Sequence, residues 1–181
     1  MSYAFEKKCY KSSSLVVALS PGMKSHITDR FPKTNAISVT NSANIKLFSS
    51  PKEIITHPQL VGKKFAIYTG NIGMVNNSEL LYRTAKKLRE EGRDDIVILL
   101  IGDGQQKEEI IKKSEGLNTI LFLELMPKVE LVNYVKNALV SIIPLNDTPI
   151  LSTSSPNKLF ESMAAAIPVI QTTNGWIKKM L

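Results

Sequence analysis

Three polar side chains, Asn157, Lys158 and Glu161, stand at the start of a segment that has the pattern of a helix. The first turn of a helix has backbone N–H groups without intrahelical partners, and the helix dipole is positive there; both features suit a phosphate group. Lys158 adds a full positive charge to that end. Glu161, one turn further along, can accept hydrogen bonds from sugar hydroxyls. These residue types are therefore typical of a site for a phosphate and an adjoining sugar.

The residues around these three define the helix that would carry the site. Ser155 suits the N-cap position, and Pro156 suits the first helical position, where its missing N–H is not needed. Pro168 ends the helix, and Val169 and Ile170 begin a short apolar strand. Apolar residues at helical spacing form the face that we expect to be buried: Leu159, Phe160, Met163, Ala164 and Ile167. The pattern also fits an ordinary amphipathic helix with a solvated charged start, so local chemistry leaves both interpretations open.

Two loops that contain glycine follow predicted strands. Gly70-Asn71-Ile72-Gly73 comes after an apolar run at 65–69, and Gly102-Asp103-Gly104 comes after an apolar run at 96–101. Glycine has no side chain, so both loops would allow a ligand to approach the backbone closely. Each loop also fits a plain tight turn, and Asp103 also suits the cap of the helix that follows it.

Short apolar runs alternate with helical patterns along the chain and predict buried strands at 15–19, 36–39, 65–69, 96–101, 119–123, 139–143 and 169–170. Asn76 followed by Glu79 predicts a capping box at the start of one helix. This order predicts an α/β fold in which helices cover both faces of a parallel sheet. Ligands of such sheets bind beyond the carboxyl ends of the strands, where both glycine loops and the helix start at Asn157 belong.

The composition is that of a globular chain, with 43% hydrophobic residues among 181 and a net charge of +7. A positive charge favours anionic ligands. The basic residues form no run longer than two, which gives no support for nucleic-acid binding. Cys9, the single cysteine, allows no internal disulfide. No apolar stretch approaches the roughly 20 residues that span a bilayer, and the start lacks a signal peptide's apolar core. We therefore expect a soluble, cytoplasmic protein.

Metal and catalytic residues are not indicated by the sequence. His26 and His57 lack carboxylate, cysteine or histidine neighbours at metal-ligand spacing, so no metal site is predicted. No nucleophile motif or paired-carboxylate spacing is present, and the catalytic residues stay unassigned. Lys128, which follows Pro127, is expected to be a solvated residue at a helix start.

The stretch at 155–170, S-P-N-K-L-F-E-x-M-A-A-x-x-P-V-I, resembles the donor-site motif of retaining, nucleotide-sugar-dependent glycosyltransferases of the GT-B fold, which has two Rossmann-like domains. The similarity is greatest to group 1 enzymes that build bacterial capsule and lipopolysaccharide sugars. The resemblance implies that the donor diphosphate lies over the helix start formed by Ser155, Pro156, Asn157 and Lys158. It also implies that Glu161 binds the ribose hydroxyls.

The same resemblance implies roles for the two glycine loops. Gly70, Asn71 and Gly73 would face the donor phosphates, and Gly102 would lie near the nucleotide base. The sequence departs from the family pattern at several positions. Thr153 replaces a frequent glutamate, Ala166-Ile167 replaces a usual Gly-Lys pair, Asn71 replaces a frequent arginine, and Asn44 replaces a usual aspartate.

The resemblance also implies a domain organisation. Residues 1–45 correspond to the last β-α-β unit of an N-terminal domain, 46–62 to a linker, and 63–181 to a Rossmann-like donor-binding domain that is incomplete at its C-terminus. The missing N-terminal domain would bind a lipid-linked or saccharide acceptor, and the full-length protein could associate with a membrane surface. An uncovered edge near the C-terminus predicts self-association there, or disorder of the last few residues.

These implications lead to a prediction of function. The chain is expected to bind a UDP- or GDP-linked sugar as the donor half of a longer glycosyltransferase of polysaccharide synthesis, with no cofactor and no metal. The isolated chain is expected to be inactive. Two alternatives stay open: a non-catalytic nucleotide-binding or scaffold fragment, and a sugar epimerase of the same fold.

Overall fold

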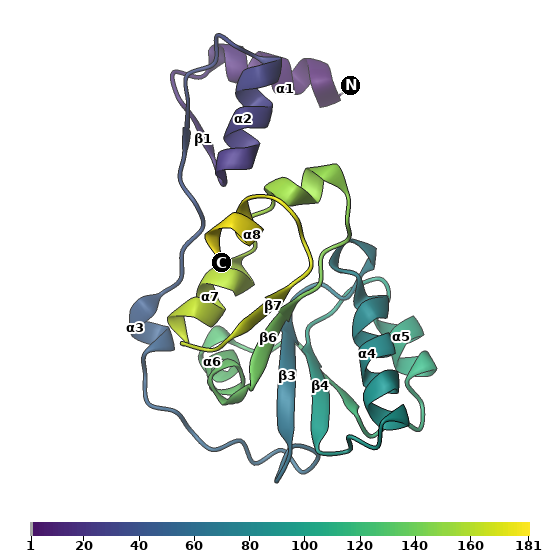
Figure 1. Cartoon of the computed structure of the whole chain (residues 1–181). Helices are drawn as coiled ribbons and strands as arrows, with labels where there is room; N and C mark the ends of the chain where they lie inside the picture. The colour runs from purple at the N-terminus through teal and green to yellow at the C-terminus, as the bar shows by residue number, and fades with distance from the viewer. Residues whose placement is uncertain (1) are drawn as a thin grey trace. The chain divides into compact units, whose positions relative to one another are not determined.

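The computed structural model describes residues 2–181 and divides into two compact units (Figure 1). The first unit contains the residues up to Ser42 together with Asp147–Pro156 and Thr173–Leu181. The second contains Ala43–Asn146 and Asn157–Thr172. No helix among residues 2–181 is long and apolar enough to cross a membrane. The domain boundaries at 45 and 62 stay predictions.

The first unit is built on a two-stranded parallel sheet. Its elements are α1 (Ser2–Ser12), β1 (Val16–Ala18), α2 (Pro21–Arg30), β2 (Ala36–Ser38), the 3₁₀ helix η2 (Pro149–Thr153) and α8 (Trp176–Met180). Ser20 is the N-cap of α2, and its hydroxyl accepts a hydrogen bond from the Met23 N–H at 3.0 Å. The same hydroxyl donates to the Thr153 carbonyl at 2.6 Å, which ties η2 to the start of α2.

The run at 15–19 does form a strand, but the prediction that it is buried is wrong for most of its residues. Val17 is paired in register with Ile37, and only Ala18 of β1 is buried. The large apolar side chains on this side of the sheet are between 41% and 53% exposed: Leu15, Val17, Leu19, Ile37 and Val39. A continuous apolar run predicts a strand that is covered on both faces. In this unit one face of the two-stranded sheet is partly exposed, and the sequence pattern does not distinguish the two cases.

The second unit confirms the predicted parallel α/β fold. Its strands lie in the order β5-β4-β3-β6-β7, and every neighbouring pair is parallel. The strands are β3 (Lys64–Thr69), β4 (Ile96–Ile101), β5 (Ile120–Leu123), β6 (Val140–Ile143) and β7 (Val169–Gln171). The chain builds β3, β4 and β5 in one direction and then crosses over β3 to place β6 and β7 on its other side.

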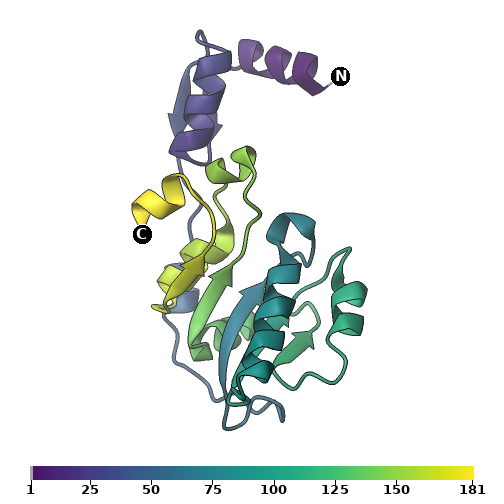
Figure 2. The same ribbon diagram turned by 45° about the vertical axis from the view of Figure 1, so that its right-hand side comes forward.

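Helices cover both faces of this sheet, as predicted (Figure 2). They are α3 (Ile45–Phe48), α4 (Ser78–Glu90), α5 (Lys107–Lys113), α6 (Lys128–Asn137) and α7 (Asn157–Ala164). Alternate residues of each strand point to opposite faces. Phe65 and Ile67 of β3 pack with α3 and α6, whereas Ala66 and Tyr68 pack with α4.

The predicted capping box at Asn76 and Glu79 is wrong. Met74–Asn76 forms the short 3₁₀ helix η1, and Asn77 has a left-handed backbone with φ of 46° at the N-cap position of α4. The Ser78 hydroxyl instead donates to the Gly73 carbonyl at 3.2 Å. This bond ties the start of α4 to the loop after β3, so the helix begins with a contact to that loop rather than with a local cap.

Helix α7 ends in a Schellman motif with alanine at the left-handed position. The Ile167 N–H donates to the Ser162 carbonyl at 3.1 Å, and the Ala166 N–H donates to the Met163 carbonyl at 3.0 Å. Ala166 has φ of 55°. Glycine usually occupies this position because a Cβ atom there meets the backbone. The departure from the family pattern at Ala166 therefore affects the end of the helix.

Replacement of Ala166 by glycine is expected to stabilise the chain by about 1 kcal/mol, because the left-handed conformation costs an L-residue about 1–2 kcal/mol and the added flexibility of the unfolded chain offsets part of the gain. Urea unfolding of the two proteins measures the difference. Ala165→Gly is the matched control and is expected to lower stability, since Ala165 has no left-handed backbone. Equal effects of the two substitutions would contradict the assignment.

Candidate functional site

The loops that follow β3, β4 and β6 meet at the carboxyl edge of the sheet. β3 and β6 are adjacent, yet the chain leaves them in opposite directions, toward β4 and β7. Such a switch point is where open α/β sheets bind ligands. The loop Gly70–Gly73 follows β3, and the side-chain amide of Asn146, after β6, donates to the Met74 carbonyl beside it. The two sides of the switch point are thus directly connected.

Gly102 allows the loop after β4 to pack closely against the loop after β3. The Gly70 N–H donates to the Ile101 carbonyl at 2.9 Å, and a Cβ atom on Gly102 would lie 1.9 Å from the Gly70 carbonyl oxygen. Gly104 stands in the same relation to Ile72, with its Cβ position 2.4 Å from that carbonyl oxygen. These distances exclude any side chain at either glycine. The predicted contact of Gly102 with a nucleotide base stays a prediction.

Asn71 and Gly73 form a tightly held turn. The buried Tyr68 hydroxyl donates to the Asn71 carbonyl at 2.5 Å. A Cβ atom on Gly73 would lie 2.6 Å from Oδ1 of Asn71, so the glycine leaves room for that side chain. The loop is therefore fixed by a buried hydroxyl beneath it, and its predicted role toward donor phosphates stays a prediction.

Lys158 reaches from α7 to this loop. Its ammonium nitrogen lies 4.0 Å from the centre of the Tyr68 ring and 3.4 Å from Oδ1 of Asn76. The Cβ position of Gly70 is only 3.4 Å from the same nitrogen, so the glycine makes space for the ammonium group. A cation over an aromatic face is attracted by the ring's negative face. The structure thus brings together Gly70 and Lys158, two of the predicted site residues.

Burial lowers the pKa of Lys158 to about 8, while the charge of Glu161 acts in the opposite direction. A buried ammonium group loses hydration, which favours its neutral form. Among the described residues, Lys158 has no carboxylate within 4.0 Å. The lysine is therefore a desolvated cation whose neighbours are a ring, an amide oxygen and a glycine.

A phosphate-bearing ligand held by Lys158 should bind more weakly as the pH rises. With a pKa of about 8, the protonated fraction of Lys158 falls about tenfold between pH 7 and pH 9. A nucleoside diphosphate stays fully charged in this range, since the second pKa of a phosphate is about 6. We expect a loss of UDP affinity of about tenfold over this interval, measured by titration calorimetry. Lys158→Met should remove the pH dependence, and a persistent slope in that variant would contradict the assignment to Lys158.

Glu161 lies one turn further along α7 and forms an ion pair. Its side chain is 12% exposed, and its Oε1 lies 2.5 Å from Nζ of Lys128, the first residue of α6. Lys128 is half-exposed, at 49%, as a helix-start residue was expected to be. Sequence reasoning missed its pairing with Glu161. The usable signal was its position, because Lys128 follows β5 at the same carboxyl edge of the sheet.

The start of α7 differs by one residue from the prediction. The helix begins at Asn157, so Pro156 precedes its first turn. Ser155 and Pro156 belong to the first unit, where the Ser155 hydroxyl accepts from the Asn41 N–H at 3.4 Å. The Ser155 carbonyl accepts from the side-chain amide of Asn41 at 2.5 Å. Their predicted contact with a donor diphosphate stays a prediction.

The buried face of α7 is also shifted from the predicted one. Leu159 is buried as expected, but Met163 is 49% exposed and Ser162 is buried in its place. The Ser162 hydroxyl donates to the Lys158 carbonyl at 2.6 Å, which satisfies its polar group inside the helix. Across residues 2–181, no three His, Cys, Asp or Glu side chains lie close enough together to hold a metal ion.

The fold and site together define a parallel α/β protein with a basic group at its switch point. The sequence matches the family of glycosyl transferases group 1 over residues 63–181, about two thirds of the chain, and the chain belongs to that family. This match confirms the family that was predicted from the motif at 155–170. The comparison with curated proteins found no match.

Solved structures of related fold agree with the family. TarM of S. aureus superposes with a TM-score of 0.67 at 14% identity, over 94% of this chain and 32% of that one. HepE of Anabaena, solved with UDP-glucose, gives 0.67 at 16% identity, over 97% and 49% of the two chains. WaaG, a glycosyltransferase of lipopolysaccharide biosynthesis, gives 0.66 at 13% identity, over 93% and 47%. The chain thus spans a third to a half of the length of these proteins.

Proposed function

We propose that this chain is the part of a group 1 glycosyltransferase that binds the nucleotide-sugar donor. The observation that carries the proposal is the desolvated ammonium group of Lys158 at the switch point of the sheet. A partly buried cation without a carboxylate within 4.0 Å is costly unless an anion compensates its charge. The diphosphate of a nucleotide sugar is such an anion, and the start of α7 adds backbone N–H groups and the positive end of its dipole.

Glu161 would bind the ribose of the same ligand through its carboxylate. It follows Lys158 by three residues, so the two side chains lie about one turn apart on the same side of α7. A ribose joined to a diphosphate at Lys158 would place its hydroxyls within reach of that carboxylate. The ammonium group of Lys128 holds the carboxylate at 2.5 Å. Binding of the ribose would therefore use an acceptor that is already oriented.

The reaction in which this site would take part is glycosyl transfer. The departing nucleoside diphosphate gains negative charge as the bond to the sugar breaks, and Lys158 with the dipole of α7 would stabilise that charge. No cofactor and no metal are needed for this role. The acceptor, a saccharide or a lipid-linked sugar, would be bound by a further part of a longer protein.

Synthesis of bacterial surface polysaccharide is the process that we propose for the longer protein. WaaG takes part in lipopolysaccharide biosynthesis, and TarM and HepE were solved with UDP in their crystals. The motif at 155–170 resembles enzymes of that kind. UDP is accordingly the nucleotide that we test first, with GDP as its competitor.

A non-catalytic nucleotide-binding role is the second candidate, because the contacts of Lys158 and Glu161 account for binding of a nucleotide without requiring a reaction. It makes the same binding prediction as the first candidate. The two differ in whether the longer protein transfers a sugar from the bound donor. A radiolabelled UDP-sugar incubated with that protein and membrane extract separates them: transfer of label supports the enzyme, and binding without transfer supports the non-catalytic role.

Titration calorimetry with UDP and with GDP tests the donor site itself. We expect one-to-one binding of at least one of the two, with a dissociation constant below about 1 mM. The ribose and base should contribute to affinity, so UDP should bind more tightly than inorganic pyrophosphate. If a folded sample shows no heat of binding with either nucleotide at millimolar concentrations, the donor-site assignment is wrong.

A further inference from the structure

The first unit contains a basic pocket that the donor site does not use. Its volume is about 720 Å³, within the range of small-molecule sites, and it is formed by α1, α2 and the segment that follows α2. Four cationic side chains line it: Lys7, Lys11, Arg30 and Lys33. Tyr10 and Phe31 supply an aromatic wall, with ring centres 5.2 Å apart in an edge-to-face contact.

The charges of this pocket are only partly compensated. Arg30 forms an ion pair with Glu6 at 3.1 Å, and its guanidinium group lies 5.3 Å from the centre of the Phe31 ring. Within the described part of the chain, Lys7, Lys11 and Lys33 form no ion pair. Residues 1–42 carry six Lys and Arg against two Asp and Glu, a net +4 of the chain's +7. More than half of the chain's net positive charge therefore lies in the first 42 residues, which include the pocket lining.

The chemistry of the lining identifies a class of ligand. Lys7 and Lys11 are four residues apart on α1 and so lie on one side of the helix, and Lys33 faces the same pocket from the segment after α2. The hydroxyl group of Thr34 adds a hydrogen-bond donor, whereas the Ser13 hydroxyl donates to the Cys9 carbonyl at 2.7 Å. Cations and hydroxyls bind phosphate oxygens, while the aromatic wall accommodates a ring or an apolar body.

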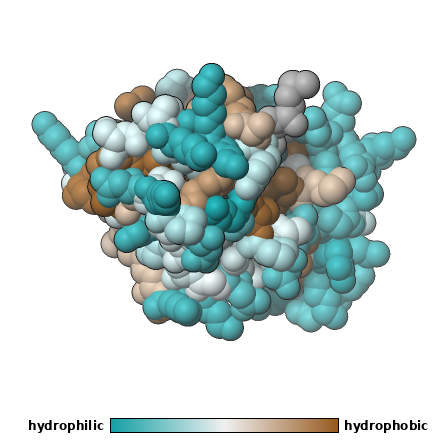
Figure 3. All heavy atoms as spheres, turned by 90° about the horizontal axis from the view of Figure 1, so that it is seen from above, coloured by the Kyte–Doolittle hydropathy of each residue, from teal (hydrophilic) through white to brown (hydrophobic). Residues whose placement is uncertain are grey.

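We propose that this pocket binds a phosphate-bearing amphipathic ligand, whose phosphate contacts Lys7, Lys11 and Lys33 and whose apolar body packs on Tyr10 and Phe31. The proposal stands independently of the donor site. Its ligand could come from two sources that share this chemistry, a soluble phosphorylated compound or the headgroup of an anionic lipid. The surface viewed in Figure 3 shows hydrophilic side chains that project around smaller apolar areas.

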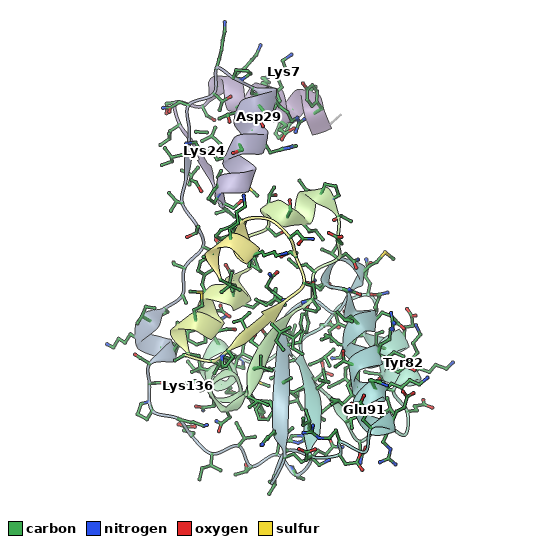
Figure 4. All side chains as sticks on the ribbon, in the orientation of Figure 1. Lys7, Lys24, Asp29, Tyr82, Glu91 and Lys136 are labelled. Atoms are coloured by element: carbon green, nitrogen blue, oxygen red, sulfur yellow. The ribbon has the colours of Figure 1, made fainter. Side chains whose placement is uncertain are left out.

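Inorganic pyrophosphate, titrated into ¹⁵N-labelled protein, tests the pocket separately from the donor site. We expect saturable amide shifts at residues 30–35, whatever happens at residues 70–73. The double variant Lys11→Ala/Lys33→Ala should weaken the response at 30–35 at least tenfold. The matched control is Lys8→Ala/Lys24→Ala, which removes two positive charges from α1 and α2 at positions outside the pocket lining. It should change the response at 30–35 less than twofold. Lys7 of the pocket and Lys24 of the control are labelled in Figure 4. The amide spectrum also reports whether each variant is folded, and single Lys→Gln variants replace any that is not.

Co-sedimentation with vesicles distinguishes the two sources. Binding to vesicles of phosphatidylcholine and phosphatidylglycerol, but not of phosphatidylcholine alone, that is lost only in the pocket variant identifies a lipid headgroup. Pyrophosphate shifts without vesicle binding identify a soluble phosphate compound. The proposal is overturned if shifts are confined to residues 70–73, or if both double variants weaken binding equally.

Discussion

Replacement of Lys158 by methionine is expected to weaken UDP binding about 10- to 100-fold, because the loss of a hydrogen bond to a charged partner costs roughly 1.5–3 kcal/mol. The ammonium nitrogen of Lys158 lies 4.0 Å from the centre of the Tyr68 ring. Methionine keeps most of the length of the lysine side chain and can still pack on that ring. The fold should not suffer, since the substitution removes a desolvated charge. Titration calorimetry and urea unfolding of the same samples measure both effects.

The control for Lys158→Met is Lys86→Met, which removes one positive charge from an exposed position of α4 in the same unit. It should leave UDP affinity within about twofold of the unchanged chain, since an exposed charge away from the site is largely screened. A large loss in both variants would mean that overall charge, rather than Lys158, holds the nucleotide. A stable Lys158→Met protein with unchanged affinity would remove the lysine from the site.

Replacement of Glu161 by alanine is expected to weaken UDP binding by about one to two orders of magnitude, again because charge-assisted hydrogen bonds are worth roughly 1.5–3 kcal/mol. The folded state should survive, since its partner Lys128 is half-exposed and the ion pair contributes about 1 kcal/mol or less. A second nucleotide sharpens the test. The unchanged chain should prefer UDP to 2′-deoxy-UDP, and Glu161→Ala should lose most of this preference.

Lys128→Met separates the ribose contact from the ion pair. It breaks the contact to Glu161 but leaves the carboxylate in place, so its loss of UDP affinity should be smaller than that of Glu161→Ala. If the two substitutions weaken binding equally, Glu161 acts by holding Lys128 rather than by contacting the ribose. If neither changes the affinity, the ribose lies elsewhere.

The framework of the second unit was predictable because its apolar runs are long and continuous. The run at 96–101 is β4, and all but the first of its residues are buried, as a strand covered on both faces requires. The motif at 155–170 predicted the start of the helix and the strand after it to within one residue, but the helix ends at Ala164, three residues before the predicted end at Ile167. The parallel order of the strands followed from their alternation with helices.

Other features depend on contacts that a sequence pattern does not contain. Gly102 fitted a loop that opens toward a ligand, but its backbone lies against Gly70 of another loop, at a distance that only the folded sheet sets. Ser162 is buried on α7 where Met163 was predicted to be, and the Lys158 carbonyl accepts the hydrogen bond of the Ser162 hydroxyl. The pairing of Lys128 with Glu161 joins residues of two helices that are 33 positions apart in sequence.

A crystal structure of this chain grown with UDP tests whether Lys158 and Glu161 hold the nucleotide. We predict that diphosphate oxygens lie within about 3.2 Å of the Lys158 ammonium nitrogen and of backbone N–H groups at Asn157 and Lys158. The ribose hydroxyls should lie at the same distance from Glu161. UDP bound elsewhere on the chain, with Lys158 still over Tyr68 and Glu161 still paired only with Lys128, would rule out a donor site at the start of α7.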